Sequence, residues 1–308
     1  IAKGAMNAAA EAQGYDSMEY GIQNGRQLGL KAIANSLYGF FGADTNPFGC
    51  KEMAASVTYF GRNIIEATQR MVTRLWGDQA RTLYGDTDSV MVNYGNVRFE
   101  NVVAQWHAMR QPDHPEETLE ELRAVMKRWM EGAPTPHHAK LILTWVAALV
   151  TEAVMNQEFQ EMGLYKIEIE LEKAYYPYIL FKKKNYAGLK TEGVVLEEPV
   201  YHPEDADKPK KQRRIVGWKL LEQPIYPTPK IDTKGIAAVR RDKTPLVRST
   251  SKAILHELLV NRSIPAAFQR LVEVLRRFAV KPGVPEVLED GRPCEGLGVD
   301  DFKTTKTT

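Results

Sequence analysis

Apolar residues recur at the helical period along several long stretches of the chain. One stretch covers residues 25–42, with an apolar stripe of Leu30, Ile33, Leu37 and Phe41. A longer one covers residues 51–76, with an expected buried side of Met53, Val57, Phe60, Ile64, Met71 and Leu75. Further helices are predicted near residues 1–20, 116–130, 140–159, 245–261 and 264–279. We expect 1–20 and 25–39 to pair as a helical hairpin.

Strand-like patterns occupy the middle of the chain. Residues 166–173 alternate Ile or Leu with charged side chains, which predicts a half-buried strand that continues over 175–181. At residues 83–92, two short apolar runs flank the polar turn Gly85-Asp86-Thr87-Asp88, which predicts a β-hairpin. Together with the helices, these strands predict an α+β fold. Residues near 95–140 and 190–230 look like insertions, and the polar stretch 197–214 is expected to be a surface loop.

Composition and charge narrow the class of protein. The chain has 308 residues, of which 44% are hydrophobic and 26% charged, so it can bury a core and is not a disordered tail. The formal net charge is only +2, so any nucleic-acid surface must come from local basic patches. Two cysteines make neither a disulfide framework nor a zinc cluster. The sequence predicts no apolar run of membrane-spanning length, so no membrane partner is expected.

Two carboxylates at the predicted hairpin tip are the first candidate site. Asp86 and Asp88 are two residues apart, and in extended chain such residues point the same way. Oxygen-only ligands of this kind suit Mg²⁺ or Mn²⁺ rather than zinc. The alternative is that Asp is simply a good turn residue.

A second candidate lies on the helix predicted over 25–42. Gln27, Lys31, Asn35 and Tyr38 follow one another at i, i+4, i+8 and i+11, so they share a face. A cation with hydrogen-bonding neighbours suits a triphosphate, and an aromatic ring can pack on a base or sugar. The alternative is an ordinary solvated helix face.

A third candidate follows the predicted strand 175–181. Lys183 and Lys184 are followed by Asn185 and Tyr186, which suits contact with a nucleic-acid backbone. A lysine run at a strand end is also a common guard against aggregation, and that alternative stays open. The adjacent His137-His138 lacks metal-ligand spacing and is expected at the surface.

Several of these stretches together resemble family B DNA polymerases, above all the delta-type catalytic subunits and their large-DNA-virus relatives. The stretch from Lys31 to Gly39 resembles motif B, and Tyr84 to Ser89 resembles motif C. Residues 183–188 are similar to the KKRY motif, and 234–242 resemble the entrance to the thumb. The order of the motifs makes this resemblance far more specific than any one of them.

The resemblance implies a role for each residue of the first two candidates. Asp88 would bind the two catalytic Mg²⁺ ions, for which Mn²⁺ could substitute, and Asp86 would support that metal site. Lys31, helped by Asn35, would contact the triphosphate of the incoming dNTP, and Tyr38 would check the nascent base pair.

The resemblance also implies a DNA surface and a domain layout. Lys183, Lys184 and Tyr186 would hold the primer-template, and Arg240 and Arg241 would lie near the duplex. Residues 1–42 would belong to the fingers, 43–235 to a palm with an antiparallel sheet, and 236–308 to the helical start of the thumb. Implied partners are primer-template DNA, dNTP and a processivity clamp reached through regions outside this chain. The implied location is the nucleus or a viral replication site, in either case intracellular.

Two departures from the family pattern matter. Motif A, which carries another metal-binding Asp, is absent, so the chain is expected to be part of a polymerase and inactive alone. Asn185 stands where the family usually has Arg, which removes one cation. Alternatives are a non-catalytic DNA-binding remnant or one subunit of a split polymerase. An RNA-directed polymerase also uses an acidic hairpin, but the linked motifs argue against it.

Overall fold

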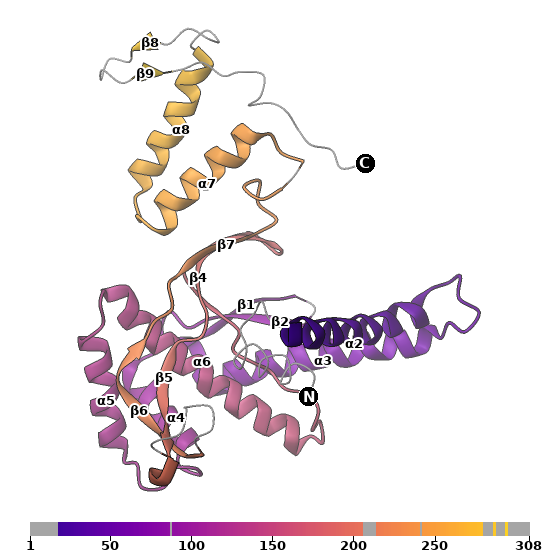
Figure 1. Cartoon of the computed structure of the whole chain (residues 1–308), viewed down its shortest axis with the longest axis vertical. Helices are drawn as coiled ribbons and strands as arrows, with labels where there is room; N and C mark the ends of the chain where they lie inside the picture. Colours follow the sequence, from indigo (N-terminus) through magenta and orange to yellow (C-terminus); the bar gives the residue numbers. More distant parts are fainter. Residues whose placement is uncertain are drawn as a thin grey trace.

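The computed structural model describes residues 18–86, 88–205, 214–240 and 242–279, and two short strands near the C-terminus. Helices and antiparallel strands alternate in blocks, which confirms the α+β class (Figure 1). The described helices are α2 (Met18–Gly42), α3 (Lys51–Trp76), α4 (Phe99–Arg110), α5 (Leu119–Glu131), α6 (Pro136–Glu161), α7 (Pro245–Leu259) and α8 (Ile264–Ala279).

The described strands form small antiparallel sheets. One sheet is the hairpin of β1 (Arg81–Asp86) with β2 (Ser89–Asn93). A three-stranded sheet has the order β3–β4–β7, from Ala174–Lys182, Asn185–Thr191 and Lys230–Lys234. The third pairs β5 (Val195–Tyr201) with β6 (Ile215–Ile225), and the short strands β8 (Glu286–Val287) and β9 (Pro293–Cys294) pair with each other. The expected surface loop over 197–214 is therefore partly wrong, because β5 includes its first residues.

The main core forms around α6. This helix buries residues on most of its circumference, against the C-terminal half of α3 and against α4 and α5. The rings of Trp106 and Trp129 lie 5.6 Å apart in this core. By length and composition α6 could cross a membrane, which corrects the expectation from sequence, but half of the qualifying stretch is buried inside the protein. An all-round apolar helix of this kind is typical of a core element.

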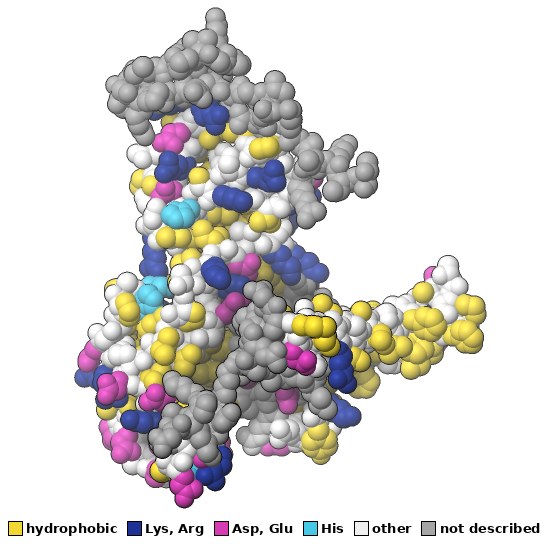
Figure 2. Space-filling view, viewed as in Figure 1, with side chains coloured by type: hydrophobic (Ala, Val, Ile, Leu, Met, Phe, Trp, Pro, Cys, Tyr) yellow, Lys and Arg dark blue, Asp and Glu magenta, His cyan; other side chains and the backbone are white. Residues whose placement is uncertain are grey.

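Helices α2 and α3 pair as an arm that projects from the body (Figure 1). Figure 2 shows hydrophobic side chains along this arm. Helix α3 was predicted correctly, whereas α2 begins at Met18 and continues through the expected break between residues 20 and 25. Much of the expected buried side of both helices is exposed: Leu30, Ile33, Leu37, Met53, Val57 and Phe60. Only the C-terminal half of α3, with Met71, reaches a core. The predicted helix over 1–20 lies largely outside the described residues, and α2 pairs with α3.

Residues 166–173 do not form the strand that their sequence predicts. Their side chains alternate between half-buried and exposed as predicted, but strand β3 begins only at Ala174. Helix α6 takes the place of a partner strand, since the Asn156 side chain bonds both backbone groups of Ile169. The Glu152 carboxylate accepts the backbone N–H of Leu171 at 2.8 Å. Side chains thus satisfy the backbone groups that a ladder would otherwise pair.

Helix α5 and the β5–β6 hairpin, far apart in sequence, pack into one unit that we call the accessory layer. A capping box between Thr118 and Glu121 starts α5. The indole N–H of Trp129 donates to the backbone oxygen of Leu221 at 2.9 Å. Arg110 at the end of α4 is buried between the carboxylates of Glu117 and Glu197. Residues of the two expected insertions therefore pack against each other on one side of the body.

Helices α7 and α8 form a separate pair above the β3–β4–β7 sheet (Figure 1). A small core joins them to it, with buried Ala187, Ala238, Leu255 and Leu259. In Figure 2, Lys and Arg side chains gather at the waist between this pair and the body.

Candidate active site

The hairpin predicted to carry the carboxylates is present. Asp86 ends β1 and pairs in register with Ser89 at the start of β2, while Asp88 is exposed in the turn. The hairpin lies so close to α3 that a Cβ added to Gly85 would stand 2.9 Å from the Ile65 side chain. A glycine before Asp86 therefore allows the hairpin to pack tightly on a long helix. Rigid elements thus hold the backbone of both acids, as a metal or catalytic site requires.

The donor set at this turn has the right chemistry for a hard divalent cation, because carboxylate oxygens are the ligands that Mg²⁺ prefers. Among the described residues, no group of three His, Cys, Asp or Glu side chains could hold a metal ion. The assignment of Asp86 and Asp88 as metal ligands stays a prediction, and two carboxylates leave room for further oxygen ligands.

Four tyrosines, which we call the tyrosine cluster, connect the hairpin to the larger sheet: Tyr84, Tyr175, Tyr178 and Tyr186. The last three rings lie 5.2–5.8 Å apart. Burial raises the pKa of Tyr178, and interaction with Tyr84 of β1 raises it further. The Tyr175 hydroxyl donates to Asp232 of β7, and its pKa is raised by burial and then by that carboxylate. Ring packing joins β3 to β4, and the Tyr175 hydroxyl joins β3 to β7.

Tyr186 has a different setting from the one expected. Its side chain is only 7% exposed, within the tyrosine cluster, so direct contact with DNA would require it to move. The structure supports a positioning role for this ring, and contact with the primer-template stays a prediction. Tyr186 is the second residue of β4 and lies two positions from Gly188, so it shares the strand face that packs against Tyr175.

Lys183 and Lys184, which we call the turn lysines, form the two-residue turn between β3 and β4. Both are exposed, and Lys184 has a φ of 63° in the left-handed region. Gly235, just after β7, has a φ of 70°, and a Cβ added there would lie 2.3 Å from the Lys184 backbone oxygen. The glycine at this position lets the end of β7 support the back of the turn.

The nucleotide-binding candidates lie together on α2, as the periodicity predicted. Lys31, Asn35 and Tyr38 are exposed on one face of this helix. Helix α3 is the element that contacts both α2 and the β1–β2 hairpin. The structure therefore connects the first two candidate sites through one rigid helix.

Arg240 is half-exposed and makes two hydrogen bonds of 2.9 Å to Asp242. The same carboxylate raises the pKa of Arg240, so a phosphate would have to compete with Asp242 for it. Arg241 lies outside the described residues. His137, expected at the surface, is 8% exposed, which corrects that expectation.

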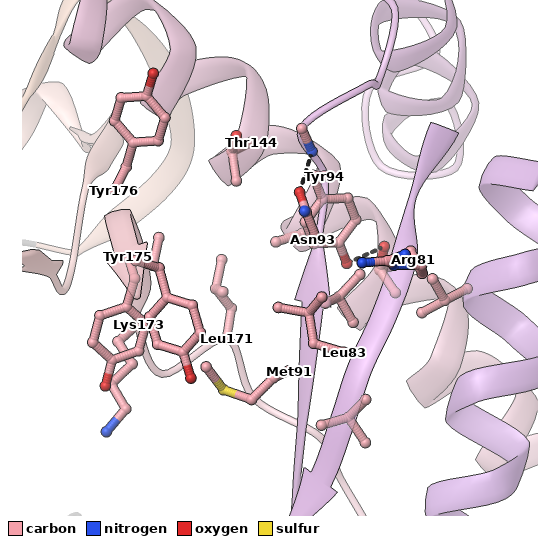
Figure 3. Close-up of a pocket in the computed structure, with 18 of the residues that line it drawn as sticks. Arg81, Leu83, Met91, Asn93, Tyr94, Thr144, Leu171, Lys173, Tyr175 and Tyr176 are labelled. Atoms are coloured by element: carbon pink, nitrogen blue, oxygen red, sulfur yellow. Dashed lines mark hydrogen bonds between the residues drawn. The ribbon is translucent and has the colours of Figure 1, made fainter. Parts of the chain in front are cut away.

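A cavity of about 700 Å³ separates the hairpin from the segment leading into β3. Figure 3 shows Leu83 and Met91 of the hairpin on one side of this cavity, with Leu171, Lys173 and Tyr175 on the other. Burial raises the pKa of Glu152, which also lines the cavity. These two flanks are extended chain, and residues of α3 and α6, among them Thr68 and Thr151, complete the lining of the cavity. The sequence contained no signal for it beyond the alternation at 166–173.

Comparison with known proteins identifies the class. The sequence model of DNA polymerase family B matches residues 3–112 and 144–282, so the chain belongs to this family. The unmatched residues 113–143 include α5 and the start of α6.

Individual relatives agree with the family assignment. The DNA polymerase delta catalytic subunit of Glycine max is 32% identical over 260 residues, which is 82% of this chain and 17% of that protein. The same subunit of Candida albicans is 31% identical, covering 84% of this chain and 18% of the relative. The DNA polymerase of Paramecium bursaria Chlorella virus NY2A is 29% identical over 95% of this chain and 23% of its own length. The chain thus spans about a fifth of the length of these relatives.

Proposed function

We propose that this chain supplies part of the active site of a DNA-directed DNA polymerase. Residues 1–42 belong to its fingers, 43–235 to its palm and 236–308 to the start of its thumb. The observation that carries the proposal is the β1–β2 hairpin, which holds Asp86 and Asp88 at its turn and packs on α3 through Gly85. Family membership supports a template-directed nucleotidyltransferase, with primer-template DNA and dNTP as its substrates.

In this reaction the primer 3′-oxygen attacks the α-phosphorus of a dNTP. A new phosphorus–oxygen bond forms, the bond to the β-phosphate breaks, and pyrophosphate leaves. Asp86 and Asp88 would hold divalent cations, which supply charge neutralisation and activation of the attacking hydroxyl when bound. Lys31 and Asn35 orient the triphosphate, and Tyr38 packs at the nascent base pair. Positioning and fixed charge are the main contributions that a protein makes to phosphoryl transfer.

The DNA surface is proposed to lie at the waist. The turn lysines bind the primer-template backbone, supported from behind by Gly235, and Arg240 contacts the duplex nearby. Tyr186 stabilises the turn from within the tyrosine cluster. Contacts of this kind position the duplex without reading its sequence.

A further carboxylate is needed to complete the metal site, and we assign its place to the cavity beside the hairpin. The cavity runs between the hairpin and the extended residues 169–173, whose backbone is partly bonded by α6 side chains. An additional acidic strand from elsewhere in the polymerase fits this gap. The chain alone is therefore expected not to extend a primer with dNTPs and Mg²⁺, and robust extension would show that the two hairpin acids suffice.

The test of the metal assignment uses the polymerase that contains this chain. Asp88→Ala should abolish dNTP incorporation and leave the Kd for primer-template nearly unchanged, since phosphate contacts elsewhere supply the affinity. Asp78→Ala, at an exposed aspartate beyond the end of α3, is the matched control and should retain activity. Retained turnover in Asp88→Ala would contradict the proposed function.

A further inference from the structure

Three side chains from separate parts of the chain form one stack where the α7–α8 pair meets the body. The ring of His137, at the start of α6, lies parallel to that of Tyr176 in β3, with centroids 4.7 Å apart and planes 15° apart. The guanidinium of Arg262, in the turn between α7 and α8, lies 5.1 Å from the centre of the same Tyr176 ring. We call these three residues the ring stack. The Tyr176 ring therefore contacts both the His137 ring and the Arg262 cation.

His137 is well suited to stay neutral in this position. Its side chain is buried, and neither ring nitrogen has a hydrogen-bond partner in the described part of the chain. Burial lowers its pKa to about 4, helped by the nearby Arg262 and His138. Its place in the first turn of α6, behind the Thr135 cap, also disfavours a positive charge. A neutral ring can share Tyr176 with a guanidinium without repulsion.

A neighbouring contact links the start of α6 to the segment that follows β6. His138 makes an edge-on contact with Tyr226, which follows β6, with centroids 4.6 Å apart. Tyr226 packs in turn against the main core. The residues of this contact therefore come from the start of α6, within the stretch that the family model leaves unmatched, and from the end of the β5–β6 hairpin.

Arg262 occupies an unusual backbone conformation for its type. Its φ is 52°, in the left-handed region where glycine and asparagine are more common. A cation–π contact offsets part of the cost of that conformation. An outlier of this kind justifies a functional hypothesis when its side chain makes a specific contact.

The other connection between the helix pair and the body is the small core of Ala187, Ala238, Leu255 and Leu259. An apolar contact is non-directional, so this core by itself specifies the orientation of the helix pair only weakly. The ring stack adds a directional contact from Arg262 to Tyr176 of β3, and His137 of α6 packs on the same ring. Two contacts to different elements restrict rotation far more than one.

We propose that the ring stack is a brace through which β3 and the start of α6 hold the thumb helices α7 and α8 in a defined position on the palm. The assignment of thumb and palm rests on the proposed function. The brace restricts motion of α7 and α8 whether or not the chain takes part in polymerase activity, so it is tested without measuring that activity.

The test is hydrogen–deuterium exchange of the full chain, without DNA. Arg262→Ala should speed exchange in peptides of the α7–α8 turn and of the adjoining half of α7 by about two- to fivefold, the size expected for one cation–π contact. His137→Ala should do the same, while peptides of the α6 core keep their protection. His137→Phe, which keeps a neutral ring on Tyr176, should exchange like the wild type. His137→Phe thus separates loss of the ring contact from unfolding of the start of α6.

Arg276→Ala is the matched control, because it removes an exposed arginine of the same helix pair. It should leave exchange in the α7–α8 turn unchanged. The double variant Arg262→Ala with His137→Ala should exchange little faster than either single variant, since each already breaks the brace. Unchanged exchange in Arg262→Ala, or an equal change in Arg276→Ala, would overturn the proposal.

Discussion

Replacement of Gly235 by alanine should be unusually costly for a change of one methyl group. Gly235 has a φ of 70°, and an L-residue with a side chain pays about 1–2 kcal/mol in the left-handed region. The new Cβ would also lie 2.3 Å from the Lys184 backbone oxygen, so the turn that carries the turn lysines must move. Such overpacking typically adds about 1–3 kcal/mol. The expected total loss is about 3 kcal/mol.

Gly193 offers a control that separates these two costs. Its φ is 67°, nearly that of Gly235, but a Cβ added there meets no atom within 4 Å. Gly193→Ala should therefore lose only the backbone part, about 1–2 kcal/mol. The assay is urea unfolding of both variants, with hydrogen exchange of the β4 and β7 amides to locate the loss. In the parent polymerase, Gly235→Ala but not Gly193→Ala should also weaken primer-template binding.

Two outcomes of the Gly235 and Gly193 experiments would contradict this prediction. If the two variants lost equal free energy of unfolding, the close approach to Lys184 would contribute nothing to the loss. The backbone conformation alone would then explain it. If Gly235→Ala lost stability but bound primer-template normally, the β3–β4 turn would not contact DNA.

Three further predictions use other parts of the structure. In a double-mutant cycle, Tyr175→Phe and Asp232→Asn should show a coupling of about 1.5 kcal/mol by urea unfolding, as expected for a hydroxyl bonded to a carboxylate; additive losses would exclude that bond. The pKa of His137 is about 4 when folded and 6.5 ordinarily, so the unfolded chain binds more protons between these values and stability falls as the pH drops. His137 should contribute about 1 kcal/mol to the loss between pH 6.5 and 5.5, so the loss in His137→Phe should be smaller by that amount. In the parent polymerase, Lys31→Ala should raise KM for dNTP and lower kcat with little change in DNA affinity. Loss of both turn lysines should instead reduce the salt dependence of DNA binding by about one unit of slope per lost phosphate contact, and the reverse pattern would show that these assignments are exchanged.

Sequence by itself determined the local elements and the family. The helical periodicity placed α3, α5, α6, α7 and α8 near their observed ranges, and turn chemistry placed the β1–β2 hairpin. These features depend on residues a few positions apart, so their signals survive without knowledge of the fold. The order of the polymerase motifs is also a linear property, and the family match agrees with it.

Tertiary structure alone decided which surfaces are covered. Residues 166–173 have the alternation of a strand, but a ladder needs a neighbour, and α6 side chains bond that backbone instead. The apolar stripe of α2 is exposed, while His137 and Tyr186 are buried. Each outcome depends on which distant segment packs against the residue. Arg262 reaches Tyr176 across 86 positions of sequence, and no local pattern encodes a contact of that range, because burial and electrostatics depend on neighbours in space.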